Sequence, residues 1–145
     1  MAAPIGAALV SRPMAQIPVV NYLDLSGDTP LLVAQKCSDC GALYFGRRNA
    51  CAKCFSTRPF ERQELARTGS VRAFTIVQRA APGVKAPYVS AIVDLDGAGH
   101  VKANVINVEP SPEAIKTGMP VRLTTFTLGT DDEGTEAIGF AFEPA

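Results

Sequence analysis

The chain has 145 residues, of which 47% are hydrophobic and 19% charged, and it carries no formal net charge. This hydrophobic content excludes a wholly disordered chain, and the length suits one ordinary domain or a small module beside a compact one. No apolar run reaches the roughly 20 residues that a membrane-spanning helix needs. We therefore expect a protein without a membrane span.

Residues 1–30 are predicted to form an N-terminal arm. The first 20 residues contain Pro4, Pro13 and Pro18 and show no helical or strand period. Such a segment is expected to be disordered alone, or to lie on a partner or on the chain's own barrel. The segment has no basic start and no long apolar run, so we do not interpret it as a signal peptide, and we expect a cytoplasmic protein.

All four cysteines of the chain belong to two Cys-x-x-Cys pairs: Cys37 with Cys40 and Cys51 with Cys54. The two intervening residues let both sulfurs of a pair face one centre, and ten residues separate the pairs. Four thiolates at this spacing indicate one tetrahedral zinc ion. Four protein ligands leave no open position for water or substrate, so the zinc is expected to be structural.

The cysteines have three alternative interpretations: two disulfides, a thioredoxin-type redox pair and an iron site. Two disulfides would need an oxidising compartment, and no export signal is visible. A thioredoxin-type redox pair needs one such motif at a strand-to-helix turn, which two matched pairs argue against. Iron prefers the same four sulfur ligands, and the sequence leaves zinc and iron both open.

Residues 31–66 are predicted to form a zinc ribbon around these cysteines, with strands at 31–36, 42–45 and 60–65. The ribbon is too small for a core of its own, so the metal is expected to supply much of its folding free energy. The segment 35–67 carries seven basic and three acidic residues, hence +4, against −4 for the remainder. This asymmetry indicates an anionic ligand near the ribbon or a solvated basic face.

Residues 67–145 are predicted to form a five-stranded OB-fold barrel. Strands are expected at 70–80, 87–95, 100–108, 120–128 and 136–142, because apolar residues alternate with polar ones there. The segment 110–118 is predicted to form one short helical turn between the third and fourth strands, with proline at its start and glycine at its end. The fold class is therefore mainly β, and the order of elements matches an OB-type barrel.

The cysteine run with its internal Gly41, Phe45 and Arg48 resembles the DUF35 family. Pro87-Tyr88 opening a strand that ends at 93–96, and the run Gly118-Met-Pro-Val121, add to the likeness, which covers roughly residues 20–145. The resemblance implies a zinc ribbon plus an OB-fold, linked to acyl-CoA metabolism. It also implies an accessory subunit that docks beside a thiolase-like enzyme and helps to form or cleave C–C bonds on CoA thioesters.

The residues themselves argue against an autonomous enzyme. Thiolase chemistry needs a nucleophilic cysteine and a histidine base, but every cysteine is assigned to metal and His100 is the one histidine. A lone histidine on the polar face of a strand is expected to be a surface residue. Asp94 and Asp96 flank a turn and are interpreted as turn formers.

A coenzyme A ester is the predicted shared ligand. Arg47, Arg48 and Lys53 are the candidates for its phosphates, since guanidinium groups suit phosphate well, and Tyr88 is the candidate that lines the pantetheine path. The alternative function is a single-stranded nucleic-acid-binding zinc-ribbon and OB protein. The net negative barrel half, the absence of Trp and the pI of 6.6 disfavour that alternative.

Overall fold

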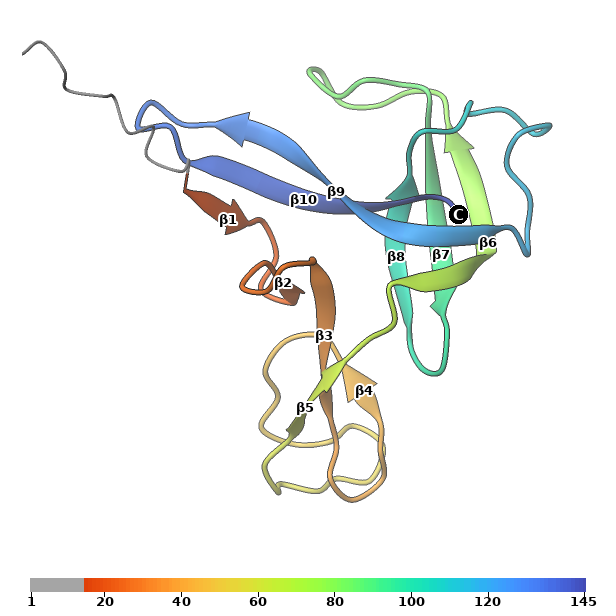
Figure 1. Cartoon of the computed structure of the whole chain (residues 1–145). Coiled ribbons are helices and arrows are strands. Elements are labelled where there is room, and N and C mark those ends of the chain that lie inside the picture. The colour runs from red at the N-terminus through yellow and green to blue at the C-terminus, as the bar shows by residue number, and fades with distance from the viewer. Residues whose placement is uncertain (1–14) are drawn as a thin grey trace, which may run out of the picture.

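The computed structural model describes residues 15–145, and every regular element in this range is a β-strand (Figure 1). In chain order the strands are β1 Gln16–Pro18, β2 Leu23–Asp24, β3 Leu31–Lys36, β4 Leu43–Tyr44, β5 Glu61–Glu64, β6 Thr68–Val77, β7 Tyr88–Leu95, β8 His100–Val105, β9 Pro120–Thr130 and β10 Glu136–Pro144. The mainly β fold is confirmed. Within the described range, no helix is long and apolar enough to cross a membrane.

The five strands β6 to β10 close into a barrel. Antiparallel pairs join β6 to β7, β7 to β8, β10 to β9 and β9 back to β6. The closing contact is parallel and joins Phe142 of β10 to Val105 of β8. The predicted five-stranded barrel is confirmed.

Alternation of apolar and polar residues fills the barrel. On β7, Val89, Ala91, Val93 and Leu95 are all at most 5% exposed, while their neighbours are half-buried. Val101, Ala103 and Val105 of β8 are likewise buried, with exposed residues between them. Phe142 is fully buried and is among the largest core side chains. Because side chains alternate across a strand, this pattern places one face of each strand in the core.

The segment 110–118 forms one short turn between the third and fourth barrel strands, as predicted. It forms a single hydrogen-bonded turn, in which Ile115 N–H donates to the Ser111 carbonyl at 3.1 Å, and it does not extend into a helix. Gly118 adopts a φ of 85°, in the left-handed region, so a helix cannot continue past it. The turn nevertheless places Ile115, with no exposed surface, against the barrel core.

The ribbon is built around β3. This strand pairs with β2, β4 and β5, all antiparallel, and β5 leads directly into the barrel (Figure 1). Leu32 and Ala34 of β3 are 1% exposed and belong to the same core cluster as the barrel residues. The ribbon therefore adds to a core that continues into the barrel.

The N-terminal arm contains two strands that the sequence did not reveal. β1 adds to β10 in parallel, with Ile17 opposite Ala137, and Gln16 Nε2 donates to Glu136 Oε2 at 2.9 Å. Of the placements predicted for the arm, residues 16–18 therefore have the one on the chain itself, against β10. β2 pairs with β3 of the ribbon. Predictions for residues 1–14 lie outside the described range.

Candidate metal centre and neighbouring hollows

Two similar backbone turns present the four cysteines. In the first turn Gly41 N–H donates to the Cys37 carbonyl at 2.9 Å, and in the second Phe55 N–H donates to the Cys51 carbonyl at 2.9 Å. Both turns end in the left-handed region, with φ of 76° at Gly41 and 62° at Phe55. Glycine takes this conformation freely, as expected for Gly41, whereas a bulky residue such as Phe55 does so with strain.

The sulfur positions fit one tetrahedral metal ion. All four Sγ atoms lie within 4.8 Å of one another, with 3.7 Å between Cys37 and Cys54 and 3.6 Å between Cys40 and Cys51. A zinc–sulfur bond of about 2.3 Å gives sulfur separations of about 3.8 Å at the edges of a tetrahedron. The four cysteines therefore suit a structural zinc ion.

The alternative uses of these cysteines fit less well. All four cysteines are free, and the shortest sulfur separations above are far longer than the roughly 2.05 Å of a disulfide. All four thiols belong to one cluster, so no pair of cysteines is left for a separate redox motif. With four protein ligands the centre has no open coordination position and suits a structural role.

Tyr44 is a neighbour of the centre that sequence reasoning missed. Its hydroxyl lies 3.4 Å from the Sγ of Cys51 and accepts the N–H of Ala52 at 3.1 Å. The guanidinium of Arg48 lies 4.0 Å from the centre of the Tyr44 ring, in cation–π geometry. The sequence signal was an aromatic residue on the short strand between the cysteine pairs. Whether its side chain points toward the metal centre depends on how the second cysteine turn folds.

The surroundings of the thiols shift the pKa values of Cys51 and Cys54 in opposite directions. The Tyr44 hydroxyl and nearby backbone N–H groups lower the pKa of Cys51 to about 6. The Ser56 N–H favours the thiolate of Cys54, but desolvation and the neighbouring sulfurs outweigh it and raise the pKa of Cys54 to about 12. Metal ligands must be thiolates, so metal binding at neutral pH releases protons from this set.

The structure brings two of the predicted phosphate ligands into one hollow. Arg47 and Arg48 line a polar hollow of about 320 Å³ together with Asn49, Thr57 and Phe60. Arg58 also borders it but forms an ion pair with Asp39 at 2.9 Å. Across residues 15–145, no carboxylate lies within ion-pair distance of Arg47, Arg48 or Lys53. Lys53 lies in the second cysteine turn, outside the lining of the hollow.

Tyr88 lies apart from the arginines. It is the first residue of β7, whereas the other end of that strand pairs through Asp94 with His100, beside the ribbon. Six residues of strand separate Tyr88 from Asp94, a distance of about 20 Å at roughly 3.3 Å per residue. Tyr88 therefore does not share the hollow that Arg47 and Arg48 line.

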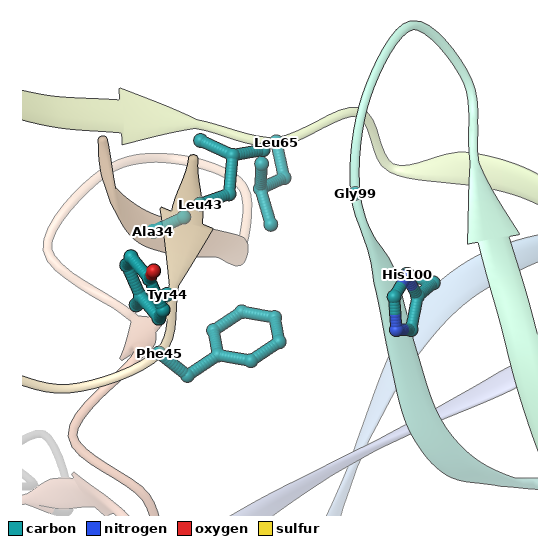
Figure 2. A pocket seen from close by; sticks show the side chains of 7 residues that line it. All are labelled: Ala34, Leu43, Tyr44, Phe45, Leu65, Gly99 and His100. Atoms are coloured by element: carbon teal, nitrogen blue, oxygen red, sulfur yellow. The ribbon is translucent and has the colours of Figure 1, made fainter. Parts of the chain in front are cut away.

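An apolar hollow of about 440 Å³ opens where the ribbon meets the barrel (Figure 2). Leu43, Tyr44 and Phe45 line it from the ribbon side, and His100 stands across from Phe45 on the barrel side. Ala34, Leu65 and Gly99 complete the lining. Because Tyr44 borders this hollow and also contacts Arg48, a single residue links the apolar hollow with the polar one.

Two family models match the chain. One describes the rubredoxin-like zinc ribbon domain of ChsH2 and matches residues 27–59, and the other describes the C-terminal OB-fold domain of ChsH2 and matches residues 62–126. Together these matches cover more than half of the chain. They agree with the metal centre and the barrel described above.

Similar proteins span most of the chain. A DUF35 domain-containing scaffold protein of Methanocaldococcus jannaschii is 30% identical over 78% of this chain and 81% of its own length. The benzoylsuccinyl-CoA thiolase subunit BbsA of Thauera aromatica is 28% identical over 80% of this chain and 78% of its own length. A solved structure, the Ltp2-ChsH2(DUF35) aldolase, is similar with a TM-score of 0.62 and 30% identity, over 79% of this chain and 84% of that one.

Proposed function

Since the chain belongs to the DUF35 family of ChsH2-type zinc-ribbon and OB-fold proteins, we propose that it is a non-catalytic accessory subunit of a thiolase-like enzyme. The observation that carries this proposal is the similarity, over both modules, to proteins named as a thiolase subunit, an aldolase component and a scaffold. The enzyme it assists forms or cleaves C–C bonds on CoA thioesters.

The residue inventory supports an accessory role. The chain has four cysteines, all in the metal cluster, and one histidine, His100, which is exposed. A thiolase reaction needs a thiolate nucleophile and a base. The chain must therefore obtain both from its partner, and its own contribution is binding and assembly.

The acyl-CoA ester is proposed to lie along the ribbon. Arg47 and Arg48 have no carboxylate partner in the described range and line one polar hollow, so they are suited to the phosphates of CoA. The adjoining apolar hollow, bordered by Tyr44 and Phe45, suits the pantetheine or acyl portion. Lys53 and Tyr88 lie outside these two hollows and are candidates for contacts made in the assembled enzyme.

The metal is proposed to be zinc in the cytoplasm, where thiols stay reduced. Four sulfur ligands suit zinc and iron alike, so the metal is identified by elemental analysis and by absorbance. A colourless protein with one zinc per chain is expected. Visible iron–thiolate absorption in protein from its native host would contradict zinc.

To test the proposal, the tagged chain is co-expressed with each thiolase-like protein of the same organism in turn. The mass of each purified complex is then measured. A stoichiometric complex that cleaves or condenses acyl-CoA is expected. Turnover of a thioester by the isolated chain would contradict the accessory role. Tight binding to single-stranded DNA at physiological salt, without any thiolase-like partner, would favour the nucleic-acid alternative.

The CoA site has its own test. The double variant Arg47→Glu/Arg48→Glu should abolish the rise in melting temperature that CoA gives to the assembled complex. The control variant Lys116→Glu changes an exposed lysine that lines neither hollow and should leave that rise intact. Equal responses of the two variants would exclude the arginine hollow as the phosphate site.

A further inference from the structure

Strands β9 and β10 continue past the barrel as a long hairpin, and β1 lies beside them (Figure 1). β9 pairs with β6 only as far as Arg122, while its pairing with β10 runs on to Thr130. From Phe126 onward every residue of β9 is exposed. We call this three-stranded part of the chain, residues 15–19, 124–130 and 136–140, the extension.

One face of the extension is covered by the chain itself. Phe142 fills the barrel, and Phe140 and Ile138 follow on the same face because side chains alternate. Ile138 is 5% exposed, and the ring of Phe140 meets the ring of Tyr22 edge-on at 5.8 Å. The covered face therefore needs no partner.

The opposite face is apolar and open. Phe126 lies opposite Gly139, and a Cβ atom on that glycine would lie 2.8 Å from the Phe126 ring and 2.8 Å from a Leu128 methyl group. Both side chains thus lie over Gly139, whose missing side chain leaves room for them. Ala137 shares this face, and Ile17 lies opposite it on β1. Residues Ile17, Phe126, Leu128, Ala137 and Gly139 form what we call the apolar stripe.

The stripe stands out among the exposed surfaces of the described residues. Six large apolar side chains there are exposed, and four of them belong to the extension: Ile17, Val19, Phe126 and Leu128. Ile17 and Leu128 are 54% and 60% exposed. Contiguous apolar surface of this kind marks an interaction site, whereas single exposed apolar residues do not.

The outer edge of β9 is also free in the described residues. Thr124 to Thr130 pair with β10 on one side, and residues of β6 pair with β9 only up to Arg122 on the other. Of the usual protections against pairing with another strand, residues 124–130 carry neither charge nor proline and have only a bulge. One bulge, at Leu128, interrupts its ladder. A partner strand can therefore add to this edge.

The tip of the extension specifies the charge of the partner. Asp131, Asp132 and Glu133 are exposed at the turn between β9 and β10. A partner that covers the stripe must bring basic side chains to this tip, and nucleic acid is disfavoured there. A second copy of this chain stacked on the stripe would bring no basic side chain from its own extension, because residues 15–19, 124–130 and 136–140 contain none.

We propose that the extension is the docking arm for the thiolase-like subunit, which covers the apolar stripe, adds a strand to the edge of β9 and places basic residues at the acidic tip. This inference rests on the proposed function, because it names the surface that the proposed partner uses. The contact with the arm is too small to act alone, so the same partner also contacts the barrel or ribbon.

The test compares Leu128→Glu with the matched control Val84→Glu in the full chain. Val84 is 54% exposed, lies in the loop between β6 and β7, and is not a residue of the stripe. Leu128→Glu should weaken binding to the co-purifying thiolase-like protein at least tenfold, measured by biolayer interferometry, while Val84→Glu stays within twofold. Both variants should keep the wild-type melting temperature, which excludes misfolding.

The outcomes separate the two proposals. If the wild-type chain binds no thiolase-like protein, the proposed function fails. If the wild-type chain binds and Leu128→Glu binds equally well, the docking arm fails while the proposed function stands. Hydrogen exchange at residues 124–130 identifies any other occupant of the stripe. Protection that depends on the concentration of the isolated chain would assign the stripe to a second copy, and protection lost when residues 2–13 are deleted would assign it to the N-terminal segment.

Discussion

The Tyr44→Phe variant tests whether the hydroxyl beside the metal centre tunes the zinc affinity. The substitution removes one oxygen, which lies 3.4 Å from the Sγ of Cys51. It retains the ring, so the contacts of that ring with Arg48 at 4.0 Å and with Phe60 at 6.0 Å remain possible. Any change in zinc affinity is therefore attributable to the hydroxyl group.

The expected effect is about tenfold weaker zinc binding, or about 1.4 kcal/mol. Loss of a group that orients a metal ligand typically lowers the metal affinity 10- to 100-fold. We expect the lower end of this range because the Lys53 N–H, 3.4 Å from the same sulfur, remains in place. The exposed N–H of Ala52, which loses its acceptor, can turn to water.

The assay is competition for zinc with a chromophoric chelator at fixed pH and salt. Tyr22→Phe is the control, because Tyr22 packs against Phe45 and Phe140 and has no hydrogen bond to a cysteine among the side-chain contacts of the described residues. Its zinc affinity should equal that of the wild type. A Tyr44→Phe variant whose zinc affinity stays within twofold of the wild type would refute the role of the hydroxyl.

Three further variants probe the centre, the barrel and the histidine. Cys40→Ser should lose zinc and unfold the ribbon, and retention of one zinc per chain by elemental analysis would contradict the ligand set. Hydrogen bonds from Asn107, and secondly from Arg122, hold the pKa of Glu143 below its ordinary value of 4.5. Glu143→Gln should therefore lower the melting temperature at pH 7, and the difference from the wild type should shrink as the pH falls below 4.5. A difference in melting temperature that does not change with pH would contradict this role of the carboxylate. His100→Ala should leave the kcat of the assembled enzyme nearly unchanged, while the KM for the ester is expected to rise because His100 lines the apolar hollow. A large loss of kcat would reveal a catalytic role.

The parts of the structure that were predictable from sequence have short-range signals. The spacing of four cysteines fixes the metal centre, because each pair lies within one turn and the turns need few residues. The barrel strands were found because apolar residues at every second position face one core, as on β7. Predicted and observed ends differ by up to three residues, as at β6 and β8, because the ends depend on pairing with neighbours.

The parts that were missed depend on contacts between distant segments. β1 has only three residues and no pattern, and its partner Glu136 lies 120 residues away in the sequence. In the sequence, Tyr44 is an ordinary strand residue. Its position beside the metal centre depends on the folded position of the second cysteine turn. The separation of Tyr88 from Arg48 was also not predictable, because it depends on the direction of strand β7.

The charge asymmetry seen in the sequence becomes two separate surfaces in the fold. Arg58 and Arg62 of the ribbon form ion pairs with Asp39, Asp24 and Glu64. Arg47 and Arg48 form none in the described residues and share one hollow. The acidic excess gathers in part at the tip of the extension, beyond the barrel. Ligand binding and subunit docking are thus expected to be separable. Arg47→Glu should weaken CoA binding without loosening the complex, and Leu128→Glu should do the reverse, so loss of both functions by either variant would contradict two independent surfaces.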